Sequence, residues 1–292
     1  MTTVRIPNPE KPLFPDGLTK AELAAYYERI AETMLPHVRG RAVHMQRFPD
    51  GIGGEVVQQK QVPDYFPDFV RRATVPRKGG GEVVHAVIEN PETLVYLAGQ
   101  ACITPHVWLS RVDRLDCPDM VAFDLDPPGR DLAPVRRAAR TIRDVLQDAG
   151  LAAFVKTTGS RGLHVVSPLK PEAGFDQVRA FARDVAALVA DRDPAAYTTE
   201  QRKEKRRGRL YLDTARNGYA QTAVAPYAVR GLPGAPVAVP LEWTEVGRVE
   251  PQDFTVRNVF RRLGRRRDPW AAMADAARPL GDARARLGDV AA

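Results

Sequence analysis

The segment "MVAFDLDPPG" (Met120–Gly129) sets two aspartates two residues apart at the end of an apolar run that two prolines terminate. Because side chains alternate between the faces of a strand, the apolar residues share one face, and Asp124 and Asp126 share the other, about 6–7 Å apart. Pro127 and Pro128 cannot donate ladder hydrogen bonds, so they end the strand there. Paired carboxylates are hard ligands that suit Mg²⁺ or Mn²⁺. The alternative is a strand end with two solvated acids.

The order of the helices and strands predicted after this strand indicates the fold. Helices are indicated by "LAPVRRAARTIRDVLQDAG", which Gly150 ends, and by "FDQVRAFARDVAALVA". Three further strands are predicted, "LAAFVKT", "GLHVVSP" and "GRLYLD". The resulting β-α-β-β-α-β order is that of a split βαβ, or ferredoxin-like, sheet.

The N-terminal part has a different pattern. Thr19 and Glu22 form a capping-box pattern before a helix predicted over about Lys20–Leu35. Short strands are expected near Ala42–Met45, Val56–Gln59 and Val83–Val87, followed by a short helix in "NPETLVYLAGQA" and a strand at "HVWLS".

The two patterns together predict an α+β protein with an N-terminal mixed α/β module packed on an RRM-like palm. We expect the module to span residues 1–112, and the palm with a C-terminal wrap to span 113–268. The Ala/Arg-rich composition of residues 269–292 favours a mobile tail.

Composition narrows the class of protein. The 292 residues are 44% hydrophobic and 27% charged, a globular profile, and no apolar run approaches the roughly 20 residues that span a membrane. The N-terminus lacks a signal-peptide h-region, and two cysteines fit a reducing compartment, so we expect a cytoplasmic, nucleoid-associated protein. The net charge of +7 and the basic runs "QRKEKRRGR" and "RRLGRRR" favour a nucleic-acid partner over solvated surface stretches.

A third acid strengthens the metal hypothesis. The strand "GRLYLD" ends in Asp213, and in a split βαβ sheet this last strand can lie beside the strand of Asp124. Three carboxylates could then hold two metal ions for phosphoryl or nucleotidyl transfer. The alternative is a turn-forming acid.

The segment "KTTGSRGLH" (Lys156–His164) joins two predicted strands and is a candidate triphosphate cradle. Its small residues expose backbone N–H groups, its hydroxyls add donors and Arg161 adds charge. It lacks the GxxxxGK spacing of a Walker A loop. The alternatives are an ordinary hairpin turn, a core role for His164 and a surface position for Arg230.

In several motifs the chain resembles the polymerase domain of bacterial ATP-dependent DNA ligase D, in the archaeo-eukaryotic primase superfamily. The resemblance runs almost end to end, and we expect a stand-alone form. The motifs that carry it are "EKPLFP", "TKAELAAYYERIAETMLPHVRGR", "RFPDGIGGE", "QKQVPDYFPDFVRRATV", "VAFDLDPP", "KTTGSRGLHVVSPL", "LYLDTARNGYAQTAVAPYAVRG" and "APVAVPLEW".

The resemblance implies roles for particular residues and a function. The implied catalytic metal ligands are Asp124, Asp126 and Asp213. The implied nucleotide-binding residues are His106, Thr158, Ser160, Arg161, His164 and Arg230. The implied DNA-binding residues are Gln58, Lys60, Arg206 and Arg216, with Lys11 and Lys20 holding the 5′-phosphate at a gap. The family implies a nucleotidyltransferase that uses two Mn²⁺ or Mg²⁺ ions and NTP or dNTP to extend primer 3′ ends at short gaps or broken ends in non-homologous end joining, favouring ribonucleotides.

The sequence departs from the family at three places. Val57 and Gln58 replace an aromatic pair that packs on the template base, and Tyr65, Phe66 or Phe69 are candidates to replace it. In addition, Arg161 replaces a common lysine, and Arg216 stands where glutamine is frequent.

The expected partners are DNA with a 5′-phosphate, a separate ATP-dependent DNA ligase and a Ku-type protein. Two other functions stay open, short-gap filling in excision repair and a non-catalytic module that binds DNA ends or recruits a ligase. Clustered anions facing a polyanion argue against the non-catalytic module.

Overall fold

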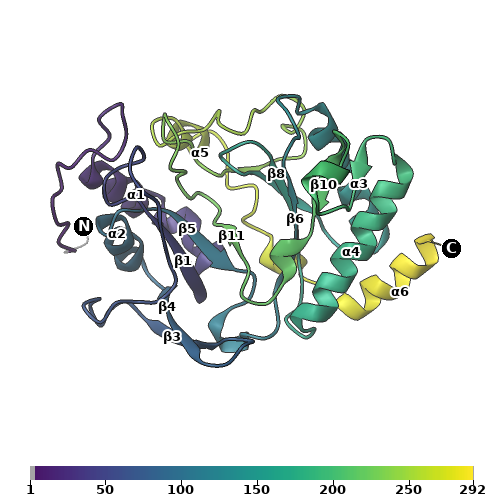
Figure 1. The fold of residues 1–292 in the computed structure, drawn as a ribbon, viewed down its shortest axis with the longest axis horizontal. Coiled ribbons are helices and arrows are strands. Elements are labelled where there is room, and N and C mark those ends of the chain that lie inside the picture. The colour runs from purple at the N-terminus through teal and green to yellow at the C-terminus, as the bar shows by residue number, and fades with distance from the viewer. Residues whose placement is uncertain (1–3, 292) are drawn as a thin grey trace. The chain divides into compact units, whose positions relative to one another are not determined.

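The computed structural model describes residues 4–291, which form two compact units (Figure 1). The first unit contains the described chain up to Asp113 with residues 222–239 and 252–266, and the second contains residues 114–221, 240–251 and the chain from Arg267. The sequence pattern divides the chain into consecutive domains, with breaks after residues 112 and 268, and this division stays a prediction.

The first unit is a mostly antiparallel sheet with helices packed on it. Its elements are α1 (Lys20–Val38), β1 (Arg41–Arg47), β2 (Val57–Gln59), β3 (Arg72–Pro76), β4 (Glu82–Ile88), α2 (Pro91–Gly99), β5 (Cys102–Trp108), β11 (Thr222–Val224) and α5 (Val259–Leu263). The strand order is β11-β5-β1-β4-β3, and β2 pairs with β1. Helices α1 and α2 contact each other, and α2 contacts β4 and β5.

Helix α1 begins at the predicted capping box. The Glu22 N–H donates to Thr19 Oγ1 at 3.2 Å, and the Thr19 N–H donates to Glu22 Oε2 at 2.7 Å. Both otherwise unpaired donors of the helix start are therefore satisfied.

A buried tyrosine joins α1 to two distant segments of the unit. The Tyr27 hydroxyl, 1% exposed, donates to the Ile103 carbonyl at 2.7 Å and accepts the Val229 N–H at 3.1 Å. These bonds hold the chain before Arg230 against β5 and α1.

The second unit has the predicted split βαβ topology. Its elements are β6 (Met120–Leu125), α3 (Ala133–Asp148), β7 (Phe154–Thr157), β8 (Leu163–Pro168), α4 (Phe175–Arg192), β9 (Tyr197–Thr198), β10 (Leu210–Asp213), β12 (Pro240–Leu241) and α6 (Leu280–Ala291). The strand order is β12-β7-β8-β6-β10-β9, so β8 separates the two strands that α3 connects. This confirms the predicted fold class.

One face of this sheet carries the core of the second unit. Helix α3 contacts β8 and β6, and α4 contacts β6 and β10 (Figure 1). Phe123, Leu125 and Val165 are fully buried, and their alternation with the polar residues of β6 and β8 leaves those polar residues to the other face.

Several elements were not predicted from the sequence. Strands β3 and β11 and the short helix α5 lack a regular apolar pattern, whereas α6 buries Leu280, Ala283 and Leu287 at helical spacing. Helix α1 also continues past its predicted end, through Pro36 to Val38. Among the residues that the structure describes, no helix is both long and apolar enough to cross a membrane.

Candidate active site

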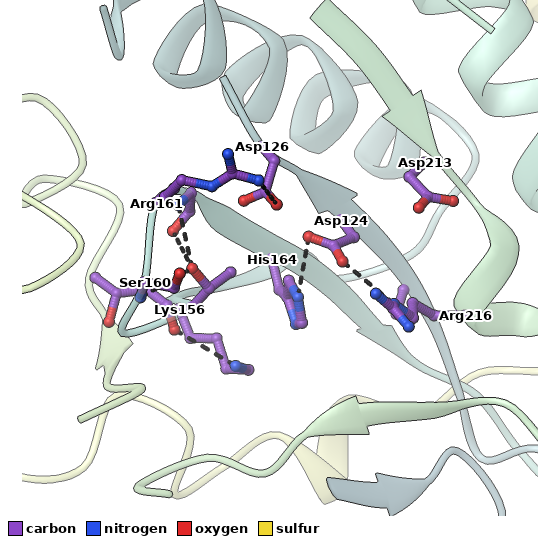
Figure 2. A network of polar contacts seen from close by, with 12 residues as sticks. Asp124, Asp126, Lys156, Ser160, Arg161, His164, Asp213 and Arg216 are labelled. Carbon is purple, nitrogen blue, oxygen red and sulfur yellow. Dashed lines mark hydrogen bonds and ion pairs between the residues drawn. The ribbon is translucent and has the colours of Figure 1, made fainter. Parts of the chain in front are cut away.

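A row of polar side chains crosses four adjacent strands of the second unit. Lys156 on β7 pairs in register with His164 on β8, His164 pairs with Asp124 on β6, and Asp124 pairs with Asp213 on β10. Directly paired residues point to the same face of a sheet. Figure 2 shows His164, Asp124 and Asp213 from neighbouring strands on one side of the sheet. The strand of Asp213 thus lies where the split βαβ order predicts, whereas Lys156 was not predicted as a member of this row.

A buried amide fixes the end of this row. After Asp213 the chain leaves β6 in a short 3₁₀ turn, Ala215–Asn217. The Asn217 side chain replaces the missing strand pairing, because its Oδ1 accepts the Ala122 N–H at 2.8 Å and its Nδ2 donates to the Ala122 carbonyl at 2.7 Å. Nδ2 also donates to the Thr214 carbonyl at 2.9 Å. Sequence reasoning missed Asn217, whose position after a strand end in "DTARNG" is the only local signal.

Asp124 is the most enclosed acid of the row. Its Oδ1 lies 3.2 Å from His164 Nε2 and its Oδ2 lies 3.2 Å from Arg216 Nε, with 12% of the side chain exposed. Burial alone raises the pKa of Asp124, but His164 and Arg216 outweigh it and hold the pKa well below its usual range. The carboxylate is therefore ionised at neutral pH.

His164 is neutral in this arrangement. Burial, with Lys156 nearby, lowers the pKa of the His164 imidazole. Its Nδ1 is buried without a hydrogen-bond partner among the described residues, where a second N–H would be costly. We therefore assign the proton to Nε2, which donates to Asp124.

Asp126 lies on the same face and behaves differently. Burial and the nearby charge of Asp124 raise the pKa of the Asp126 carboxyl. Arg161 NH2 lies 3.3 Å from Asp126 Oδ2, and 46% of the Asp126 side chain is exposed (Figure 2). The structure therefore keeps two close acids in different environments.

The loop between β7 and β8 folds tightly against the end of β6. The Thr158 hydroxyl accepts the N–H groups of Ser160 (3.3 Å) and Gly162 (3.1 Å), so it shapes the turn. A Cβ on Gly162 would lie 2.0 Å from the Leu125 carbonyl oxygen and 2.7 Å from Asp126 Oδ1. Only glycine lets the loop approach the two acids this closely.

The remaining implied nucleotide residues belong to the first unit. His106 on β5 pairs in register with His44 on β1, and the two rings lie 6.0 Å apart. Burial, followed by the charge of Lys60, lowers the pKa of His44. The Arg230 N–H donates to the Pro236 carbonyl at 2.7 Å. Sequence reasoning missed His44.

The structure brings the two candidate 5′-phosphate lysines together. The Lys20 N–H donates to the Lys11 carbonyl at 3.0 Å. Burial, then the charges of Lys11 and Arg47, lowers the pKa of the Lys20 amine. Lys11 Nζ pairs with Asp50 Oδ1 at 2.9 Å, and Lys20 Nζ donates to the Pro7 carbonyl at 2.8 Å.

The other candidate DNA residues lie in separate places. Gln58 and Lys60 are exposed beside β2. Arg206 stacks on Tyr211, 4.1 Å from the ring centroid, and Arg216 contacts Asp124.

The candidates for an aromatic substitute divide by burial. Phe66 is 2% exposed and belongs to the core, whereas Tyr65 is 61% and Phe69 41% exposed. Only Tyr65 and Phe69 therefore have ring surface available to a base.

The acids fit a divalent ion by chemistry. Across the described residues, no three acid, histidine or cysteine side chains converge as they would around an ion. The three carboxylates nevertheless supply the oxygen ligands that Mg²⁺ and Mn²⁺ prefer. Burial, and then the charge of Asp124, raises the pKa of Asp126, and a cation would relieve the repulsion between the two acids.

Comparisons with known proteins show what the chain is similar to. The family model described as "LigD, primase-polymerase domain" matches residues 19–270. The "Multifunctional non-homologous end joining protein LigD" of Mycolicibacterium smegmatis is 33% identical over 96% of this chain, and the "Bifunctional non-homologous end joining protein LigD" of Bacillus subtilis is 32% identical over 86%. This chain spans only 37% and 41% of those relatives. The structure described as "Polymerase Domain from Mycobacterium tuberculosis Ligase D in complex with DNA" matches with a TM-score of 0.87 and 30% identity, over 95% of this chain and 100% of that one.

Proposed function

Because the chain belongs to the LigD primase-polymerase domain family, we propose that it is a DNA repair nucleotidyltransferase that extends primer 3′ ends at short gaps or broken ends. The observation that carries the proposal is the register of β6 and β10, which sets Asp213 directly opposite Asp124 on the polar face of the sheet. A module that only bound DNA would gain nothing from acids facing a polyanion.

Asp124, Asp126 and Asp213 are the residues that would hold two Mn²⁺ or Mg²⁺ ions. Such ions activate the primer 3′-hydroxyl and neutralise charge on the triphosphate and the pyrophosphate leaving group. Asp124 is already ionised by its contacts with His164 and Arg216, so no proton must leave it.

The β7–β8 loop is the candidate triphosphate cradle. Arg161 supplies positive charge beside Asp126, at the turn that the Thr158 hydroxyl holds close to the end of β6. A guanidinium held there offsets charge that develops on the transferred phosphate. His106 and Arg230, in the first unit, are further candidate nucleotide-binding residues.

Lys11 and Lys20 are the candidate anchor of the downstream 5′-phosphate. Burial, and then the charge of Lys11, lowers the pKa of Lys20, and a bound phosphate would relieve the repulsion between the two lysines. We propose gapped or broken DNA with a 5′-phosphate as the substrate, ribonucleotides as the preferred addition, and a Ku-type protein and an ATP-dependent ligase as partners.

Two substitutions test the proposal in a primer-extension assay with Mn²⁺, ATP or dATP and gapped DNA. Asp124→Ala should abolish extension and leave binding to 5′-phosphorylated gapped DNA largely intact. Extension at the wild-type rate by this variant would refute the site assignment. Lys11→Ala should remove the preference for a 5′-phosphate while retaining extension. An unchanged preference would refute the anchor.

Short-gap filling in excision repair is a second candidate, favoured by one observation. Val57 and Gln58 are exposed where the family carries an aromatic pair. Neither side chain can stack on a template base as an aromatic ring does, which weakens the grip on an unpaired template. Extension confined to gaps of a few nucleotides, with none across two broken ends, would favour this role.

A further inference from the structure

The arginine-rich segment after Asn258 takes no part in the site described above. We propose that Arg261, Arg262 and Arg265 form a second phosphate-binding site, which holds the backbone of the downstream DNA strand beyond its 5′ end. The inference rests on the proposed function in taking DNA as the anionic partner.

The first observation is a pocket of about 290 Å³ in the first unit. Its size lies at the small end of ligand sites, which suits a phosphate with its sugar better than a large molecule. The pocket lies at α5 and is lined by Asp253, Phe254, Asn258, Arg261, Arg262 and Arg265.

The second observation is charge. Among the described residues, Arg261 and Arg265 form no side-chain ion pair or hydrogen bond, and both are exposed. Arg262 lies over the Phe254 ring at 4.8 Å from its centroid, which holds its guanidinium in place. Three guanidinium groups and one carboxylate, Asp253, line the pocket, so its net charge is positive and attracts a phosphate.

The third observation is position. Arg257, one turn before Arg261, pairs with Asp16 at 2.9 Å, and Asp16 lies in the turn between Lys11 and Lys20. Phe260 contacts Tyr26, with ring centroids 5.6 Å apart, and α1 begins at Lys20. The pocket therefore belongs to the same packed region as the candidate 5′-phosphate anchor, where the next phosphates of that strand would pass.

The test measures binding of 5′-phosphorylated gapped DNA by fluorescence anisotropy between 0.05 and 0.3 M salt, roughly the range in which phosphate contacts dominate affinity. Each lost contact should lower the salt slope by about 0.9, which is about eightfold in affinity at 0.1 M salt. Because both arginines face the same phosphate, the double variant Arg261→Gln/Arg265→Gln should lose that one contact, about 0.9 in slope. Arg257→Gln is the matched control, because that arginine is already paired with Asp16 and should change the slope little.

Three outcomes decide the proposal. An unchanged slope in a double variant with a wild-type unfolding midpoint overturns it, and Arg265→Gln alone gives the same answer if the double variant unfolds. The proposal is also overturned if ATP or inorganic phosphate binds wild type but not the double variant while the salt slope of DNA binding is the same in both. The pocket would then be a site for a free ligand. Primer extension by wild type is measured in parallel. Extension with an unchanged slope refutes only the pocket, whereas absence of DNA binding by wild type refutes the proposed function as well.

Discussion

Replacing Asn217 with alanine should uncouple the end of β10 from β6. Asn217 is fully buried and makes three hydrogen bonds, two to Ala122 and one to Thr214. A buried hydrogen bond contributes about 1 kcal/mol net, so Asn217→Ala should cost about 3 kcal/mol of unfolding free energy. In a unit of this size that lowers the unfolding midpoint by about 6–12 °C. Asp213 would also lose its fixed position opposite Asp124, and a shift of about 1 Å in catalytic groups can cost about 100-fold in rate.

Two measurements on Asn217→Ala separate stability from activity. Thermal unfolding gives the stability loss, and single-turnover primer extension at a temperature where the variant is folded gives the rate. Asn90→Ala is the control, because Asn90 caps α2 by accepting the Thr93 N–H at 2.9 Å, and its loss should cost about 1 kcal/mol with extension unchanged. Wild-type stability and rate in Asn217→Ala would refute the reasoning.

Three further substitutions test other parts of the account. Asp126→Asn should stabilise the metal-free protein at pH 7. Because the pKa of Asp126 is raised in the folded state, the native state binds more protons than the unfolded state. Ionising Asp126 therefore lowers the free energy of unfolding as the pH rises through that pKa. The gain, seen in thermal unfolding with EDTA, should shrink as the pH falls through that pKa, and a pH-independent gain would contradict the assignment. Tyr65→Ala should weaken template binding by about 1–3 kcal/mol by anisotropy, and an unchanged Kd excludes a stacking role. Tyr27→Phe should lower the free energy of unfolding in urea by about 1–3 kcal/mol, because the Ile103 carbonyl and the Val229 N–H lose a buried partner, and a smaller loss would show that they find another.

The fold of the second unit could be predicted because its signals are local. Alternation in "VAFDLD" and "LYLD" fixes which side chains share a face, and the helix between β6 and β7 has an apolar stripe with arginines opposite. The split βαβ order then allows the strand of Asp213 to lie beside that of Asp124, and the structure confirms that these two strands pair.

The contacts around these acids could not be predicted in the same way. Asn217 and Lys156 join the site through pairing between strands that are distant in sequence, and no local pattern distinguishes them from ordinary turn or strand residues. Arg216 was expected to contact DNA, and its contact with Asp124 depends on the turn after β10. The structure buries Phe66 and exposes Tyr65, and composition alone could not predict which of the two rings is accessible.

Binding of Mn²⁺ in the presence of a nonhydrolysable nucleotide tests the central claim most directly. The claim is that Asp124, Asp126 and Asp213 form one divalent-ion site for nucleotidyl transfer. Electron paramagnetic resonance should show Mn²⁺ bound to wild type and lost in Asp124→Ala and in Asp213→Asn, with primer extension lost in the same variants. Mn²⁺ binding of wild-type strength in both variants would contradict the account.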